Sequence, residues 1–466
     1  MKRPLKNLVS LLVGDIGSRL LGFLITVYLA RVLESSAFGV INIGLSVLGY
    51  LMLLASPGVQ MLETRNAAAV LGTNELRVNA ILSLRFLLAI GLLIVTAIVS
   101  WLVVSPAHVR ENVLLFSLSL IPLSLFLDWF FQGKEKFAAV SIAKLLSYLV
   151  YGIVVIVAVR SAEDVVRVPI AFAAGNVAAT LFLVIIYRKF GKFKLVWQPS
   201  EWKSVLASNV PVGFAVFLAQ SAMNLPPIVI GWFVSTAGAG MFSAALKIVF
   251  VLLMLDRILN ALFLPVATRY LSSRRDEAPL LISVVTKFVF IIVLPMTICG
   301  VMLSPLAISI VFGAGYAESI PLLQILMGYF FLTLMNSLFV CTLVGAHRER
   351  EYTSAVNIGS VIFVVGIVLG TFVLGAIGAA IGVVAGELCT VALMWLQVRK
   401  TLSISFWSSI VRPVVACCIM IASTVLFKEQ RITLQILISL AVYVVTLLLL
   451  RGIESKEIQF LRERFV

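Results

Sequence analysis

Ten ionisable residues stand inside long apolar stretches of the chain. Charged side chains in a membrane span are costly, so they usually face a cavity or a charged partner. Bases outnumber acids among them, which favours an anionic ligand such as phosphate or diphosphate and disfavours a cationic drug. The bases are Arg19, Arg85, Lys144, Lys247, Arg257 and Lys287, and the acids are Asp15, Asp128, Asp256 and Glu387.

The depth of these residues in the expected spans divides them into two groups. Arg85, Lys144, Lys287 and Asp128 lie within about two helical turns of a span end, where long basic side chains can instead snorkel to the interface. Five others lie deeper, where a cavity or a buried pair is favoured: Arg19, Lys247, Arg257, Asp256 and Glu387. The four acids either neutralise bases or couple transport to H⁺ or Na⁺.

Helical spacing indicates which of the deeper groups share a face. Asp15 and Arg19 are four residues apart and can pair. Lys247 and Arg257 are about 80° apart on an ideal helical wheel, so they can line one wall. Asp256 is about 180° from Lys247 and is expected to face a neighbouring helix.

Several kinds of chemistry are excluded. The five cysteines lie in apolar runs without zinc-type spacing, and the two histidines, His108 and His347, fall in expected loops. A histidine-rich metal or catalytic site is therefore not available. The chain also lacks a GxxxxGK[ST] phosphate-binding loop, so we expect neither ATP hydrolysis nor a cofactor.

The composition requires lipid as the main solvent of these stretches. Of 466 residues, 61% are hydrophobic and 12% charged, whereas a soluble domain is about a quarter charged. Unalternating apolar runs of about 20 residues predict membrane helices rather than barrel strands. We expect an all-α integral membrane protein with fourteen spans near 8–30, 38–58, 80–103, 113–131, 138–159, 166–187, 205–232, 239–266, 281–303, 320–343, 353–374, 377–398, 408–427 and 432–450.

The net charge of +15 comes from short basic clusters between the apolar runs, which argues against nucleic acid as a partner. Loops on one side hold roughly four times as many bases as loops on the other, so the positive-inside rule puts both termini in the cytoplasm. No loop exceeds roughly 20 residues, which leaves no room for a soluble catalytic domain.

An internal repeat is visible at an offset of about 200 residues. Gly39 in the second expected helix aligns with Gly240, Gly133 with Gly345, and Gly175 with Gly386. Six helices per copy is an even number, so the copies run parallel, as in one class of transporters. The predicted organisation is an N-lobe at 1–187, a connecting loop at 188–204, a C-lobe at 205–400, and two further helices with a tail at 401–466.

The repeat also relates polar positions in the first and seventh helices. Arg19 corresponds to Gln220, which adds Gln220 to the expected cavity. In the same seventh helix, Pro226 and Pro227 follow Asn224, and they predict a helix break that acts as a gate or, alternatively, a simple kink. The GxxxG spacings around Gly370 and Gly378 favour close helix packing.

The run SRLLGFLITVYLARVLESSAFGVINIGLSVLGYLMLLASPG resembles the opening of the Wzx-type polysaccharide transporters. The segments SNVPVGFAVFLAQ and SPLAISIVFGAGYAESIPLLQIL are similar to the same family. These transporters belong to the multidrug/oligosaccharidyl-lipid/polysaccharide (MOP) exporter superfamily. The resemblance implies two six-helix lobes around a V-shaped cationic cavity, to which Arg19, Lys247 and Arg257 would contribute here.

The resemblance further implies a flippase of the bacterial inner membrane. Its substrate would be a polyprenyl-diphosphate-linked oligosaccharide, such as an O-antigen unit, and its energy would come from an H⁺ or Na⁺ gradient or the membrane potential. Polysaccharide polymerases or ligases are possible partners besides the lipids. Alternative functions are a lipid II flippase, a cation-coupled multidrug exporter and, in a different class, a membrane-embedded glycosyltransferase or ligase.

Overall fold

The protein is helical throughout the part that the computed structural model describes, which confirms the predicted all-α class. That part comprises residues 2–69, 74–104, 106–274, 276–402, 406–427, 432–454, 456–457 and 459–460. The helices are α1 (Lys2–Ala55), α2 (Val59–Ala69), α3 (Glu75–Val103), α4 (Ala107–Ser117), α5 (Leu120–Ser124), α6 (Asp128–Gly133), α7 (Phe137–Ala158), α8 (Arg167–Tyr187), α9 (Pro199–Phe233), α10 (Thr236–Leu252), α11 (Met254–Ser273), α12 (Ala278–Val311), α13 (Ser319–Gly345), α14 (Glu349–Thr401), α15 (Phe406–Leu426) and α16 (Ile432–Leu449), with 3₁₀ turns η1 (Ala162–Val166) and η2 (Ala314–Tyr316).

Ten stretches of the described chain are long and apolar enough to cross a membrane. Two of them, Ile16–Ala55 and Glu349–Lys400, contain 40 and 52 residues, which is at least twice the length of about 20 that one crossing needs. Each contains one residue with non-helical backbone angles, Glu34 or Gly375, so each holds two of the predicted spans. The remaining predicted spans, 205–232 and 408–427, correspond to α9 and α15.

The long helix α14 is a hairpin whose halves pack through glycines. Gly375 has a φ of 61°, a left-handed conformation that glycine adopts without strain. On either side of it, a Cβ on Gly370 would lie 2.3 Å from the carbonyl oxygen of Gly378, and one on Gly366 would lie 3.1 Å from the Cα of Gly382. The predicted close packing is therefore confirmed, and it lies within α14.

The internal repeat appears as the same helix ending in both copies. Two residues after Gly133 and Gly345, Glu135 and His347 have nearly equal positive φ values of 54° and 56°. In each copy the next residue donates its backbone N–H to the carbonyl five residues earlier, at 2.8 and 2.9 Å. This backbone pattern satisfies carbonyls that the helix end leaves free.

The aligned glycines also pack on matching neighbours. A Cβ on Gly133 would lie 2.6 Å from the Thr64 carbonyl oxygen, and one on Gly345 would lie 3.1 Å from the backbone nitrogen of Thr268. Gly175 likewise meets Tyr151, and Gly386 meets Phe363, which stands 212 positions after Tyr151. The repeat seen as similar residues is therefore also a repeat of contacts.

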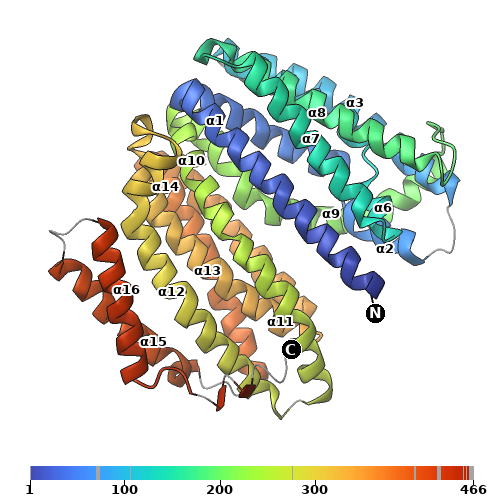
Figure 1. Ribbon diagram of the computed structural model, residues 1–466. Helices are drawn as coiled ribbons and strands as arrows, with labels where there is room; N and C mark the ends of the chain where they lie inside the picture. The colour runs from blue at the N-terminus through green and yellow to red at the C-terminus, as the bar shows by residue number, and fades with distance from the viewer. Residues whose placement is uncertain are drawn as a thin grey trace. The chain divides into compact units, whose positions relative to one another are not determined.

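The chain divides into two compact units, Met1–Ser243 and Ala244–Val466. In the first unit, α7 runs beside the first half of α1 (Figure 1), where Gly14 faces Ser141 and Gly22 faces Tyr148. The core of this unit gathers side chains of α3, α6, α7 and α8. In the second unit, α13 packs on α11, α12 and α14, and α15 and α16 pack on α12.

Candidate functional site

Four of the residues predicted to line the substrate-binding cavity lie in the first unit, namely Arg19, Gln220, Arg85 and Lys144. Arg19 is exposed on the first half of α1, within the candidate span Ile16–Ala55. Gln220, its counterpart in the repeat, is exposed on α9. The side chain of Asp15 lies outside the part of the chain that the structure describes, so the predicted Asp15–Arg19 pair stays a prediction.

Arg85 is buried in the first unit, with 8% of its surface exposed, rather than extended toward an interface. Its guanidinium donates to the carbonyl oxygens of Phe126 at 3.0 Å and Leu123 at 2.9 Å. These carbonyls lie where the span Ala107–Gly133 is broken between α5 and α6, which leaves backbone acceptors without helical donors. Arg85 therefore donates hydrogen bonds to backbone carbonyls at the interruption of a membrane helix.

Asp128 is the first residue of α6, next to this break. With its amide nitrogen turned toward Asp128, Gln60 of α2 lies 3.1 and 3.3 Å from the two carboxylate oxygens, and its oxygen lies 3.1 Å from Gln132 Nε2. Lys144, half-buried on α7, is the other residue predicted near this end of the unit. The structure thus places Asp128 in a local amide network.

Lys287 on α12 forms a buried ion pair with a residue 170 positions away. Its Nζ lies 2.8 Å from both carboxylate oxygens of Glu457, and only 6% of the lysine side chain is exposed. The expected interior base is therefore held by the C-terminal tail, and its charge is used to fasten that tail to α12.

Lys247 and Arg257 lie in the second unit, on α10 and α11. Lys247 is half-buried and Arg257 is exposed, and both belong to the candidate span Thr236–Ser273. Leu253 separates the two helices. The expected angle of about 80° assumes one ideal helix, so it does not fix the relative direction of these two side chains.

A polar network surrounds Asp256 between α11 and α13. Its carboxylate accepts hydrogen bonds from Ser337 Oγ and from Asn260 Nδ2, the latter at 3.2 Å. Asn260 also donates to Ser337 Oγ at 2.9 Å and accepts from Cys341 Sγ at 3.2 Å. The prediction that Asp256 faces a neighbouring helix agrees with these contacts.

Glu387 lies in the same unit and is also held by an amide. Asn336 Nδ2 on α13 donates to Glu387 Oε1 on α14 at 2.7 Å. Asn336 directly precedes Ser337, which contacts Asp256, so α13 contacts both acids through adjacent residues. Neutral donors on one helix thus hold two carboxylates inside the second unit.

The helix α9 continues through Pro226 and Pro227, both buried, rather than breaking there. Proline removes a backbone donor, yet its φ is compatible with a helix, so neighbouring turns can hold the segment together. Asn224 faces Gly49 of α1, where an added Cβ would lie 2.7 Å from its Oδ1. A gating role for these three residues stays a prediction.

The aligned glycines Gly39 and Gly240 are in direct and reciprocal contact. A Cβ on Gly39 would lie 1.8 Å from the Thr236 carbonyl oxygen, and one on Gly240 would lie 2.0 Å from the Ser35 carbonyl oxygen. Thr236 stands 201 positions after Ser35, the same offset that relates the glycines. Corresponding residues of the two copies therefore meet with a local two-fold relation.

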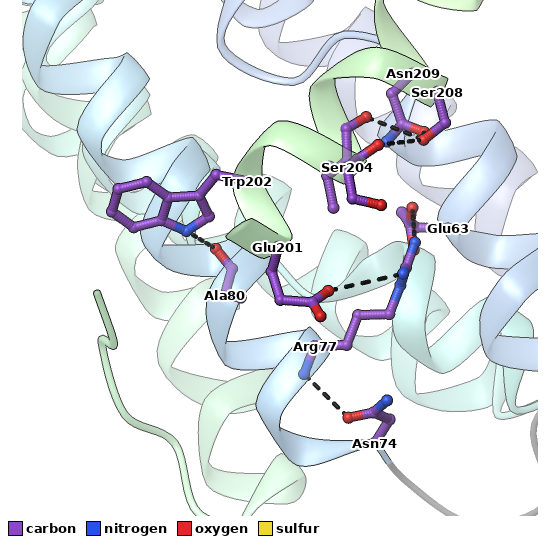
Figure 2. A network of polar contacts seen from close by, with 10 residues as sticks. Glu63, Asn74, Arg77, Ala80, Glu201, Trp202, Ser204, Ser208 and Asn209 are labelled. Carbon is purple, nitrogen blue, oxygen red and sulfur yellow. Dashed lines mark hydrogen bonds and ion pairs between the residues drawn. The ribbon is translucent and has the colours of Figure 1, made fainter. Parts of the chain in front are cut away.

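Figure 2 shows a further network in the first unit, which the sequence analysis did not anticipate. Arg77 of α3 donates from Nε and Nη2 to both carboxylate oxygens of Glu63 at 3.1 and 2.9 Å, and its Nη1 lies 3.9 Å from Glu201 of α9. Glu63 has only 1% of its side chain exposed. Nearby, Trp202 Nε1 donates to the Ala80 carbonyl at 2.9 Å.

The loop predicted to connect the lobes is fastened along α3 beside this network. Asn79 donates to the carbonyl of Lys192 at 2.8 Å and accepts from the N–H of Lys194 at 3.2 Å, and Ser83 accepts from the N–H of Val196 at 2.7 Å. Lys192, Lys194 and Val196 alternate along an extended segment of the loop. Their backbone groups therefore reach Asn79 and Ser83, which lie one helical turn apart on α3. The polar residues Asn79 and Ser83 are visible in the sequence, but no spacing rule predicts that the loop binds to them.

Comparisons with known proteins agree with this architecture. One curated relative, named "Putative O-antigen transporter", from Escherichia coli (strain K12), is 23% identical over 406 residues, covering 85% of this chain and 96% of its own. A structure of the lipid II flippase MurJ in an inward closed conformation superposes with a TM-score of 0.81 at 14% identity, covering 95% and 99% of the two chains. An inward-facing multidrug transporter of the MATE family gives 0.62 at 16% identity, covering 83% and 94%.

The helices and these likenesses define a multi-pass membrane protein with the fold of the MOP exporter superfamily. The model of the family described as "Polysaccharide biosynthesis protein" matches residues 5–271, which is more than half of the chain. The chain belongs to this family, and the resemblance seen in its sequence is confirmed.

Proposed function

We propose that the protein moves a polyprenyl-diphosphate-linked oligosaccharide, an O-antigen or related repeat unit, across the bacterial inner membrane. Transport would run from the cytoplasmic to the outer leaflet by alternating access, with both termini in the cytoplasm. Family membership and the Escherichia coli relative, which this chain covers almost completely, support this function. The protein would act as a transporter and not as an enzyme.

The observation that carries the proposal is the exposure of bases on membrane spans. Arg19 and Arg257 are exposed although each lies within a candidate span. A guanidinium facing hydrocarbon is costly, so such side chains usually face a water-filled cavity or bind an anion or another polar group. A diphosphate group would lower that cost through charge-assisted, bidentate hydrogen bonds, and Lys247 would add a third positive charge.

The three parts of the substrate need different surroundings because their chemistry differs. The diphosphate binds the bases, the hydrophilic sugars need a hydrated passage, and the polyprenyl tail stays in lipid. The energy would come from an ion gradient or the membrane potential. Asp256 and Glu387, held by neutral donors on α13, are the acids best placed to exchange a proton or Na⁺.

Alanine substitution tests the role of the bases. The triple variant Arg19→Ala, Lys247→Ala and Arg257→Ala should lose surface-glycan export while its membrane level stays normal. The double variant Arg19→Lys and Arg257→Lys, with Lys247 unchanged, retains all three charges and should keep part of the activity. Full export by the alanine variant would exclude these residues as the anion site.

The acids need a separate experiment. Transport into vesicles should be measured with an imposed proton gradient and, separately, with a sodium gradient. Asp256→Asn and Glu387→Gln should abolish stimulation by whichever gradient drives the wild-type protein. Unchanged stimulation in both variants would remove these acids from the coupling step.

A lipid II flippase is the second candidate, because the fold is similar to one at a TM-score of 0.81. Both cargoes carry a polyprenyl diphosphate, so the bases alone do not distinguish them. A competition binding experiment distinguishes the two cargoes. If the proposal is correct, an excess of lipid II should displace the lipid-linked oligosaccharide only weakly. Equal or stronger displacement would favour lipid II as the substrate.

A further inference from the structure

A separate polar cavity lies inside the first unit, beside the break between α5 and α6. Its volume is about 260 Å³. Its walls come from the end of α1, from Gln60 and Arg85, and from the segment around the break, and its apolar lining includes Met52, Leu53, Leu123 and Phe126. The polar side chains that line it are Ser56, Gln60, Arg85, Ser124 and Asp128.

The cavity walls carry hydrogen-bonding capacity that the protein leaves unused. Arg85 is more than nine-tenths buried, and although its two terminal nitrogens bind carbonyls, its Nε has no hydrogen-bond partner among the described residues. An ionised carboxylate offers about four acceptor positions, and Gln60 approaches Asp128 with one amide nitrogen. The Asp128 carboxylate therefore keeps acceptor capacity beyond its bond with Gln60, and a hydroxyl of a bound molecule could use it.

The charges in the walls select the kind of molecule. A phosphate would be attracted by Arg85 but repelled by Asp128, and a metal cation would meet the opposite pair of forces. A neutral group with several hydroxyls avoids both penalties, because each hydroxyl can donate to the carboxylate and accept from the guanidinium or the amide. Sugar rings have this chemistry, and flat apolar side chains beside the polar ones suit their C–H faces.

We propose that this cavity is a subsite for a sugar ring of the transported glycan, an inference that rests on the proposed function. It would recognise the oligosaccharide, whereas Arg19, Lys247 and Arg257 would bind the diphosphate. Asp128 and Gln60 make the direct contacts, and Arg85 holds the broken helix in place through the carbonyls of Phe126 and Leu123.

Equilibrium binding to the full-length protein in nanodiscs tests the subsite. Two probes are compared, the polyprenyl-diphosphate-linked oligosaccharide and the same polyprenyl diphosphate without sugar. Gln60→Leu and Asp128→Asn should each weaken binding of the glycan-bearing lipid about tenfold, the usual effect of losing one hydrogen bond to a bound ligand, and leave the sugar-free lipid unchanged. Gln324→Leu, a half-buried glutamine on α13, is the matched control and should change neither.

The possible results separate the subsite from the proposed function. If both variants bind the glycan-bearing lipid as tightly as the wild type, the cavity holds only water. This result would overturn the subsite but not the proposed function. Equal weakening for both lipids would also overturn it, because the cavity would then serve the fold and not the sugar. A wild-type protein that binds no glycan-bearing lipid would refute the proposed function and the subsite together. Gln60 is exposed, so Gln60→Leu keeps the test valid if Asp128→Asn fails to fold.

Discussion

The reciprocal contact of Gly39 and Gly240 makes Gly39→Ala a severe substitution for so small a change. The added Cβ would lie 1.8 Å from the Thr236 carbonyl oxygen, whereas ordinary contact begins at 3.4 Å, so α1 and α10 must separate locally by about 1.6 Å. Overpacking usually costs about 1–3 kcal/mol, and the upper value applies here because a backbone oxygen cannot rotate away. Alanine's better helix propensity returns about 0.5–1 kcal/mol, which leaves a net loss of about 2 kcal/mol.

The free energy of unfolding, from denaturant titration in mixed micelles, measures this loss. Gly91→Ala is the matched control, because nothing lies within 4 Å of a Cβ at Gly91 and the variant should be slightly more stable than the wild type. The double variant Gly39→Ala/Gly240→Ala should lose less than the sum of the single losses, since one separation makes room for both methyl groups. Equal stability of Gly39→Ala and Gly91→Ala would refute the reasoning.

Three further substitutions test other contacts, two by the same titration and one by limited proteolysis. Glu63→Gln should cost about 2 kcal/mol, because Arg77 loses a buried, bidentate carboxylate; a loss below about 0.5 kcal/mol would contradict a buried pair. Lys287→Met should release the tail at Glu457, seen as faster limited proteolysis of the C-terminus, and an unchanged cleavage rate would show that the pair does not hold the tail. Gly378→Ala should have a net cost of about 2 kcal/mol, like Gly39→Ala, because its Cβ would lie 1.8 Å from a carbonyl oxygen of the opposite half of α14. Unchanged stability would contradict the hairpin packing.

Hydropathy and the repeat were sufficient to predict most of the fold. Apolar runs of the right length predict membrane helices because lipid allows few other structures. Pairs such as Gly133 and Gly345 marked the repeat because both helix endings require the same close backbone approach. The interruption between α5 and α6 was not predicted, since Asp128 and its neighbours read as one continuous apolar span.

The roles of the individual charges were harder to predict, because they depend on partners distant in sequence. Lys287 is neutralised by Glu457, 170 residues away, and Arg85 binds backbone carbonyls at the break between α5 and α6. Hydropathy reports that a charge lies in a span, but it does not report what the charge contacts. Arg19 and Arg257 are exposed on their spans, and their place in a hydrated passage stays a prediction.

Transport by the purified protein in liposomes tests the central claim most directly. A lipid-linked oligosaccharide with a fluorescent sugar is placed in both leaflets, and a membrane-impermeant glycosidase is added outside. The account predicts that the wild-type protein makes nearly all of the sugar accessible to the enzyme, whereas liposomes with the triple alanine variant protect the inner half. Protection of the inner half by wild-type liposomes, under both proton and sodium gradients, would contradict the assignment as a flippase.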